Sequence, residues 1–331
     1  MEYVDFERKV FDISGERMPK GAWWWWFWLF FFDNPDDPSR PRQLMILWST
    51  KNVKDIVCND VNLKLSPGCD RSRMPGAVAA WYYDGSEMHH NYLLENCDIL
   101  VSKGSVSSDS EVPAVFSVDG MRSEVVVGDH MRFISEASND HEFMKPIYVA
   151  DDVVGDIGYS ILKLNRLELS GEVDGRATRG TSYFQRVFVN SPVPPWYWAV
   201  VHFENGAVLT YYNPHFHLTS IREDISYYDG ERLHRFKSAD ISRSGDDLPS
   251  FTVSGENRDA TIRLTVDAYS HSSWTFKKKT LGLVPNKLVY NEYPIVVSDF
   301  TFKDKSSGEV TTLEDLGSSV GNAEHTTGFL L

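Results

Sequence analysis

The sequence predicts an all-β protein, either a sandwich or a barrel of antiparallel strands. Strand-like runs of β-branched and aromatic residues recur about every ten residues, and turn signals such as Asp84-Gly85 and Asn205-Gly206 follow them. Apolar residues at helical spacing are nearly absent. In addition, nine of the ten residues from 23 to 32 are Trp or Phe, which favour the pleated surface of a strand.

The aromatic run at residues 23–32 is the first expected strand, and residues 44–48 complete a hairpin with it. Successive side chains of a strand point to opposite faces, so Trp24, Trp26 and Trp28 share one face. Both faces are apolar, so the strand is either buried on both sides or lines an apolar cavity. We expect these three tryptophans to bind substrate; an ordinary core strand is the alternative. The run is too short for a membrane-spanning helix, which needs about 20 residues.

Further strands are expected along the rest of the chain. The length of 331 residues suits two domains, and the strand rhythm is interrupted around residues 150–156. We therefore predict two domains, residues 1–156 and residues 157–331. The polar segment from residue 304 onward ends in apolar residues, and these last residues are expected to dock back on the body. The main further strands are expected at residues 78–83, 112–118, 124–127, 131–136, 159–170, 181–189, 196–203, 207–212, 261–269 and 295–302.

The hairpin at residues 196–213 contains the candidate site. A two-residue type I′ loop at Asn205-Gly206 would place His202 opposite Leu209. Large aromatic side chains with a few hydrogen-bonding groups on one face are typical of a small-molecule pocket. A core histidine among core tryptophans is the alternative. On this face we predict two catalytic residues that exchange protons, His202 and Tyr211, and three substrate-binding residues, Trp196, Trp198 and Asn213.

Charge and motif content argue against several classes of function. The formal net charge of −14 disfavours nucleic acid as a partner. The charged amino terminus is no secretion signal, and the three cysteines lack C-x-x-C spacing, so we expect a cytoplasmic protein. His215 and His217 would share a strand face, but no third ligand accompanies them, and we expect no metal. Motifs of hydrolases, kinases and dehydrogenases are absent, and we expect no cofactor. The oligomeric state stays open.

Several segments resemble one known superfamily. Residues 159–176, residues 180–186 and Trp196-Tyr197-Trp198 are similar to the linker and first strands of the second domain in the AttH/CrtC-like superfamily. Residues 21–27 resemble the opening of its first domain. That superfamily includes carotenoid 1,2-hydratases and resembles tocopherol cyclases and lipocalin-like Diels-Alderases. The resemblance implies two tandem lipocalin-like antiparallel β-barrels.

The resemblance also implies an enzyme that hydrates, cyclises or isomerises an apolar small molecule, such as an isoprenoid or polyene, without a cofactor. The Asp-His-x-Trp sequence of the hydratases is replaced here by residues 185–188, and their Tyr-Asp pair by residues 211–213. Arg186 cannot donate a proton at neutral pH but can hold a ligand oxygen, so we predict that it binds substrate; a surface ion pair is the alternative. A non-catalytic carrier of an apolar ligand and a structural scaffold are the other hypotheses.

Overall fold

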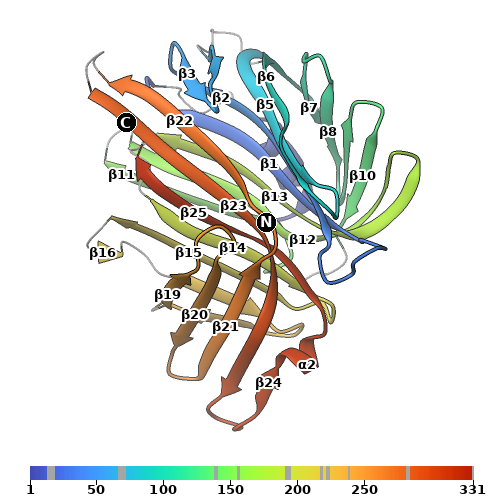
Figure 1. The fold of residues 1–331 in the computed structure, drawn as a ribbon, viewed down its shortest axis with the longest axis vertical. Helices are drawn as coiled ribbons and strands as arrows, with labels where there is room; N and C mark the ends of the chain where they lie inside the picture. The colour runs from blue at the N-terminus through green and yellow to red at the C-terminus, as the bar shows by residue number, and fades with distance from the viewer. Residues whose placement is uncertain are drawn as a thin grey trace.

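The computed structural model describes residues 1–12, 19–65, 72–137, 141–154, 157–190, 195–216, 219–220, 224–237, 239–280 and 284–329. The described chain consists mainly of strands, as predicted, and these form two antiparallel sheets that lie against each other (Figure 1). Its helices are α1 (Tyr3–Phe11) and α2 (Leu313–Leu316). Neither of these two helices has the length and apolar character that a membrane crossing requires.

The first sheet closes into a barrel of ten strands. Strand β10 pairs with β9 on one side and with residues 168–173 of β12 on the other, which joins the two ends of the sheet. An eleventh strand, β11, pairs with the other end of β12. The strands are β1 (Trp23–Phe32), β2 (Arg42–Lys51), β5 (Arg73–Tyr83), β6 (Met88–Ser102), β7 (Ser105–Ser108), β8 (Ala114–Asp119), β9 (Arg122–Val127), β10 (Met131–Glu136), β11 (Ile147–Val154), β12 (Ile157–Val173) and β13 (Arg176–Asn190).

The aromatic strand β1 alternates between two faces, as predicted, and one face fills the barrel. Trp24, Trp26 and Trp28 belong to the barrel core, and each is at most 1% exposed. Helix α1 adds Phe6 and Val10 to the same core, and the indole N–H of Trp26 donates to the Val10 carbonyl at 2.9 Å. The rings of Trp24 and Trp26 meet edge to face with centroids 6.0 Å apart. This packing matches the core-strand alternative better than the wall of a cavity.

The second sheet is open among the described residues. Its order runs β18-β17-β15-β14-β25-β23-β21-β20-β19, and no described pairing joins β18 to β19, so a second closed barrel stays a prediction. The strands of this sheet are β3 (Ile56–Cys58), β4 (Val61–Leu63), β14 (Trp196–Phe203), β15 (Val208–Phe216), β16 (Thr219–Ser220), β17 (Asp224–Tyr228), β18 (Leu233–Phe236), β19 (Ala239–Ser244), β20 (Ser250–Glu256), β21 (Ala260–Ala268), β22 (Ser272–Thr280), β23 (Val284–Asp304), β24 (Val310–Thr312) and β25 (Ser319–Phe329).

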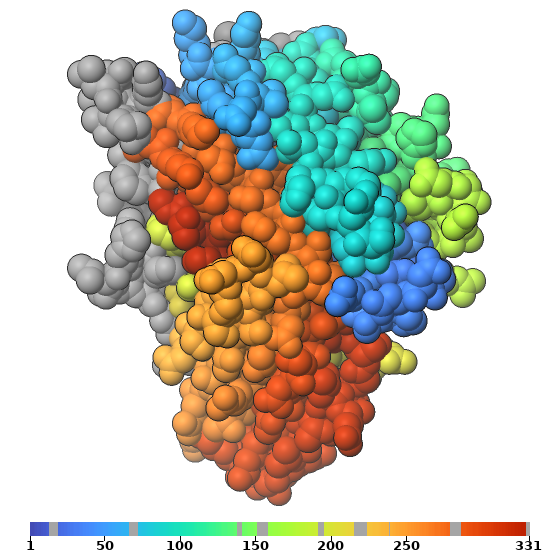
Figure 2. All heavy atoms as spheres, in the orientation of Figure 1, coloured from blue at the N-terminus to red at the C-terminus, as the bar shows by residue number. Residues whose placement is uncertain are grey.

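The two sheets exchange chain segments. β12 and β13 belong to the first sheet, so the chain passes to the second sheet between Asn190 and Trp196 and not at residue 157. β3 pairs with β22 of the second sheet. In Figure 2 the segment that contains β3 is blue and lies directly against the orange segment that contains β22. The predicted division into domains 1–156 and 157–331 remains a prediction; the boundary between the sheets lies later in the chain.

The polar segment near the carboxyl end forms a central strand of the second sheet. β25 lies between β14 and β23 and pairs with both along most of its length. Gly321 makes the close approach to β14 feasible, because a Cβ atom there would lie 2.4 Å from the Val200 carbonyl oxygen. The segment is therefore paired into the second sheet as far as Phe329. Leu330 and Leu331 lie outside the described residues.

An apolar interface joins the two sheets. The second face of β1 contributes Trp23, Phe27 and Leu29, and the second sheet contributes Trp198 and Val200 to the same cluster. Burial of large aromatic side chains on both sides supplies the free energy that holds the sheets together. The candidate site described below lies in this interface.

Candidate functional site

The central hairpin has a register different from the predicted one. Its loop comprises residues 204–206 instead of two residues, and Gly206 adopts a positive φ of 93° at its third position. His202 therefore pairs with Val208 and not with Leu209. Since side chains alternate along a strand, this shift of one residue exchanges the two faces of β15.

The nine predicted site residues consequently lie in three places. Trp24, Trp26, Trp28 and Arg186 are in the core of the first barrel. Trp196, Trp198 and His202 share the face of β14 that points towards the interface between the sheets, and Tyr211 and Asn213 lie on the opposite face of the second sheet. The prediction that His202 and Tyr211 exchange protons on one face is therefore wrong.

His202 is a fully hydrogen-bonded core histidine. Its Nε2 lies 2.7 Å from the Asn165 carbonyl and its Nδ1 lies 2.7 Å from the Thr181 hydroxyl. A carbonyl only accepts, so Nε2 carries the proton and Nδ1 accepts from Thr181. Burial, followed by the nearby Arg166 charge, lowers the pKa of His202 to about 3. The ring is neutral at pH 7 and both nitrogens are occupied, as the alternative interpretation expects.

A substitution of His202 tests this structural role. His202→Ala leaves the Thr181 hydroxyl and the Asn165 carbonyl without their partners inside the protein. We expect a loss of about 3 kcal/mol in the free energy of unfolding, measured by urea denaturation. A variant as stable as the wild type would contradict the structural role.

Tyr211 and Arg186 are buried in separate cores. Tyr211 is 1% exposed, and burial raises the pKa of its hydroxyl well above the ordinary value. Arg186 is 4% exposed and its guanidinium carbon lies 4.8 Å from the centre of the Trp24 ring. Arg186 therefore does not lie at the surface, where the alternative interpretation placed it. The substrate-binding role of Arg186 and of the tryptophans stays a prediction.

Two buried glutamates in the interface were missed by the sequence analysis. Glu292 on β23 and Glu324 on β25 are directly opposite each other and are 0% and 4% exposed. The Tyr290 hydroxyl lies between them, 2.5 Å from Oε1 of Glu324 and 3.2 Å from Oε1 of Glu292. The three side chains form one continuous chain of hydrogen bonds.

Three indole N–H groups complete the surroundings of the two carboxyl groups. Trp81 and Trp274 both donate to Oε2 of Glu292, at 2.5 and 3.2 Å. Trp196 donates to Oε2 of Glu324 at 2.7 Å. Trp81 comes from the first barrel and the other two tryptophans come from the second sheet. The site therefore needs both sheets.

The hydrogen bonds require a proton on one of the carboxyl groups. Burial raises the pKa of Glu292, and burial together with the Glu292 charge raises the pKa of Glu324. The single Tyr290 proton can be donated to only one carboxylate, so the other contact needs a carboxyl proton. Glu292 receives two indole donors and Glu324 receives one, so the anion is better stabilised at Glu292. We assign the shared proton to Glu324, with Tyr290 donating to Glu292.

Sheet register positions this site. One cross-strand row consists of Ser272, Glu292, Glu324 and Trp198 on four adjacent strands, β22, β23, β25 and β14. Side chains of one row share a face of the sheet, so both glutamates point towards the first barrel. The sequence signal that could have indicated this site is a glutamate two residues from a large aromatic residue in an expected strand, as in Tyr290-Asn291-Glu292. Side chains at this spacing share a face of the strand.

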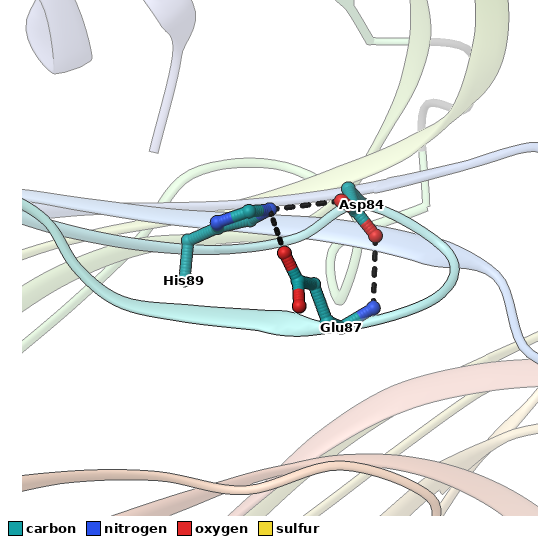
Figure 3. Close-up of side chains that lie close together, drawn as sticks. All are labelled: Asp84, Glu87 and His89. Carbon is teal, nitrogen blue, oxygen red and sulfur yellow. Dashed lines mark hydrogen bonds and ion pairs between the residues drawn. The ribbon is translucent and has the colours of Figure 1, made fainter.

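Asp84, Glu87 and His89 form a second polar group, at the turn between β5 and β6 (Figure 3). One ligand atom of each lies within 4.8 Å of the others, and Nε2 of His89 is 2.8 Å from Asp84. The same contact recurs at 2.8 Å between Asp229 and His234, where an arginine stands at the position of Glu87. Because an arginine is no metal ligand, the repeated Asp–His contact is best explained by the shared turn. His217, which was expected to share a strand face with His215, lies outside the described residues.

Comparisons with known proteins identify the fold. No protein-family model and no curated protein matches the sequence. A solved structure assigned as an AttH, from Nitrosomonas europaea, is 12% identical with a TM-score of 0.55, covering 96% of this chain and 95% of that one. CghA in complex with Sch210972 (9%, TM-score 0.49, 94% and 89% covered) and kievitone hydratase from Nectria haematococca (10%, TM-score 0.44, 94% and 90% covered) are also similar. The resemblance predicted from residues 21–27, 159–176, 180–186 and 196–198 is thus confirmed at the level of the fold, which this chain shares with the AttH structure.

Proposed function

We propose that this protein is an enzyme that transfers protons to and from an apolar small molecule, and so hydrates, cyclises or isomerises it without a cofactor. The observation that carries this proposal is the buried chain Glu292–Tyr290–Glu324 between aromatic walls. A carboxylic acid that keeps its proton at neutral pH is a general acid, and a carboxylate beside it is a general base. The protein itself therefore holds both groups that the chemistry needs.

The proposed reaction begins at Glu324. Its carboxyl proton is transferred to one carbon of a ligand double bond, which leaves a positive charge on the neighbouring carbon. The indole faces of Trp196 and Trp198 stabilise that cation through their quadrupoles. The Glu292 carboxylate then accepts a proton, either from an attacking water or from a carbon next to the cation. Tyr290 then donates its hydroxyl proton to Glu324 and accepts the proton that Glu292 holds, which restores both carboxyl groups to their starting states.

The apolar ligand is proposed to be isoprenoid- or polyene-like and to lie between the two sheets. The many aromatic and aliphatic side chains of the interface cluster suit such a molecule. In this proposal the second sheet acts as the second barrel of a tandem pair, since it has an apolar core of its own. A non-catalytic carrier of the same ligand is the alternative.

The proposal is tested by transfer of deuterium from solvent. The purified protein is analysed by native mass spectrometry for a bound apolar molecule, and that molecule is incubated with the protein in D2O. Farnesol serves as the probe if nothing copurifies. We expect deuterium at carbon, or a hydrated product, to accumulate only with the folded protein. Binding without deuterium transfer would favour a carrier, and absence of binding would favour a scaffold.

A further inference from the structure

Buried polar atoms without partners lie next to the carboxyl pair. Asn322 is 0% exposed, and neither Nδ2 nor Oδ1 of its amide has a hydrogen-bond partner among the described residues. Gln43, also 0% exposed, donates to the Gly321 carbonyl at 2.9 Å and to the Tyr269 hydroxyl at 2.6 Å, but its Oε1 is unpartnered in the same part of the chain. Together the two side chains offer one unused donor group and two unused acceptors.

The sheet register explains why the Asn322 amide has no protein partner. Asn322 precedes Glu324 by two residues on β25, so the two side chains share one face. Its neighbours on the flanking strands are Pro294 and Val200, whose side chains cannot form hydrogen bonds. Gln43 reaches the adjacent Gly321 from the first barrel. The unpartnered atoms therefore lie at the contact between the sheets, beside the proposed acid.

Such an arrangement is costly in a protein interior. The large majority of buried side-chain polar atoms in folded proteins have a hydrogen-bond partner, and an unpaired one carries its full desolvation penalty. A leucine has nearly the shape of an asparagine and would carry no such penalty. A ligand that completes these hydrogen bonds accounts for the amide at this position.

We infer that Asn322 and Gln43 bind a hydroxyl group of the ligand, so the substrate is a hydroxylated apolar molecule and not a hydrocarbon. This inference rests on the proposed function of the adjacent site. A hydroxyl oxygen accepts from the Asn322 amide N–H while its proton is donated to the free Oε1 of Gln43. A carbonyl would use the donor and leave both acceptors unpaired. The hydroxyl group thereby fixes the position of the ligand's apolar chain relative to the Glu324 carboxyl group.

Binding of three matched probes tests the inference. Farnesol, farnesal and farnesene share one isoprenoid chain and differ in bearing a hydroxyl, a carbonyl or no oxygen. We expect the wild type to bind farnesol about 10-fold more tightly than the other two, measured by quenching of tryptophan fluorescence. Asn322→Leu should bind farnesol and farnesene equally. No preference in the wild type, no binding of any probe, or an unchanged preference in the variant would overturn the inference.

A stability measurement gives a readout that needs no ligand. Asn322→Leu should raise the melting temperature of the ligand-free protein by about 2 °C, because it removes an unpaired amide. Thr326→Val is the matched control on the same strand and face. The Thr326 side chain is 0% exposed and its hydroxyl accepts from the backbone N–H of Trp196 at 2.7 Å, so this variant should have a lower melting temperature than the wild type. A lower melting temperature for Asn322→Leu would show a structural role and overturn the inference. Probe preference without any deuterium transfer would overturn the proposed enzyme and leave the binding inference standing.

Discussion

Replacement of Glu324 by Gln is expected to reduce turnover of the bound ligand by about 10²- to 10⁴-fold, with little change in its dissociation constant. Glutamine has nearly the same shape, and its carbonyl oxygen can still accept from the Trp196 indole at the position of Oε2. It cannot release a proton to the ligand. The rate of deuterium transfer in single-turnover experiments measures this loss, and fluorescence quenching measures the affinity.

Two further variants separate the roles within the hydrogen-bonded chain. Glu292→Gln removes the base, so we expect the second proton transfer to be slow. The loss of turnover should be comparable to that of Glu324→Gln. Tyr290→Phe should permit one turnover and slow the following ones, because the proton can no longer pass from Glu292 to Glu324. The control is Glu309→Gln, because the Glu309 side chain is exposed to solvent. Full turnover in Glu324→Gln would rule out this acid.

The strand alternation was predictable from sequence, whereas the register was not. The two faces of β1 follow directly from a period of two residues, and Trp24 and Trp23 accordingly lie in different cores. Asn205-Gly206 is compatible with a two-residue loop and also with a three-residue loop that ends in glycine. Local sequence does not decide between these loops. The difference of one residue in loop length determines which side chains of β15 share a face with His202. The residues of the predicted site therefore lie on different faces.

The carboxyl pair could not be found from local sequence because its surroundings come from distant parts of the chain. Trp81 and Glu292, which share a hydrogen bond, are 211 residues apart in the sequence. Glu324 lies in a segment whose polar, Gly- and Ser-rich composition is typical of a loose tail. It becomes buried only because β25 is inserted between β14 and β23. Composition indicates exposure here, and long-range strand pairing overrides it.

The stability of the protein relative to its Glu292→Gln/Glu324→Gln variant is expected to fall as the pH rises from about 5 through neutrality. Burial raises the pKa of both carboxyl groups in the folded state above the value of 4.5 that a free glutamate has. The native protein therefore keeps protons that the unfolded chain releases. Their contribution to stability is complete below the unfolded pKa and is lost as the pH rises through the folded values.

The magnitude of this effect follows from proton linkage. Each group lowers the free energy of unfolding by up to about 1.4 kcal/mol per pH unit within that window. His202 and Lys51 act in the opposite direction, because burial lowers the pKa of His202 to about 3 and that of Lys51 to about 7. The native state thus holds fewer protons at these two positions than the unfolded chain. The double variant retains both groups, so subtracting its unfolding free energy at each pH isolates the carboxyl pair.

Urea denaturation of the two proteins between pH 5 and 9 measures this difference. Near pH 5 the wild type and the double variant should have similar stability, since neutral carboxyl and amide groups fill the same space. At pH 9 the variant should be more stable by several kcal/mol, because the wild type then buries two adjacent negative charges with only hydrogen-bond donors around them. A difference that does not change with pH would mean that the two glutamates ionise in the interface as they do in water, and neither could then serve as the acid at neutral pH.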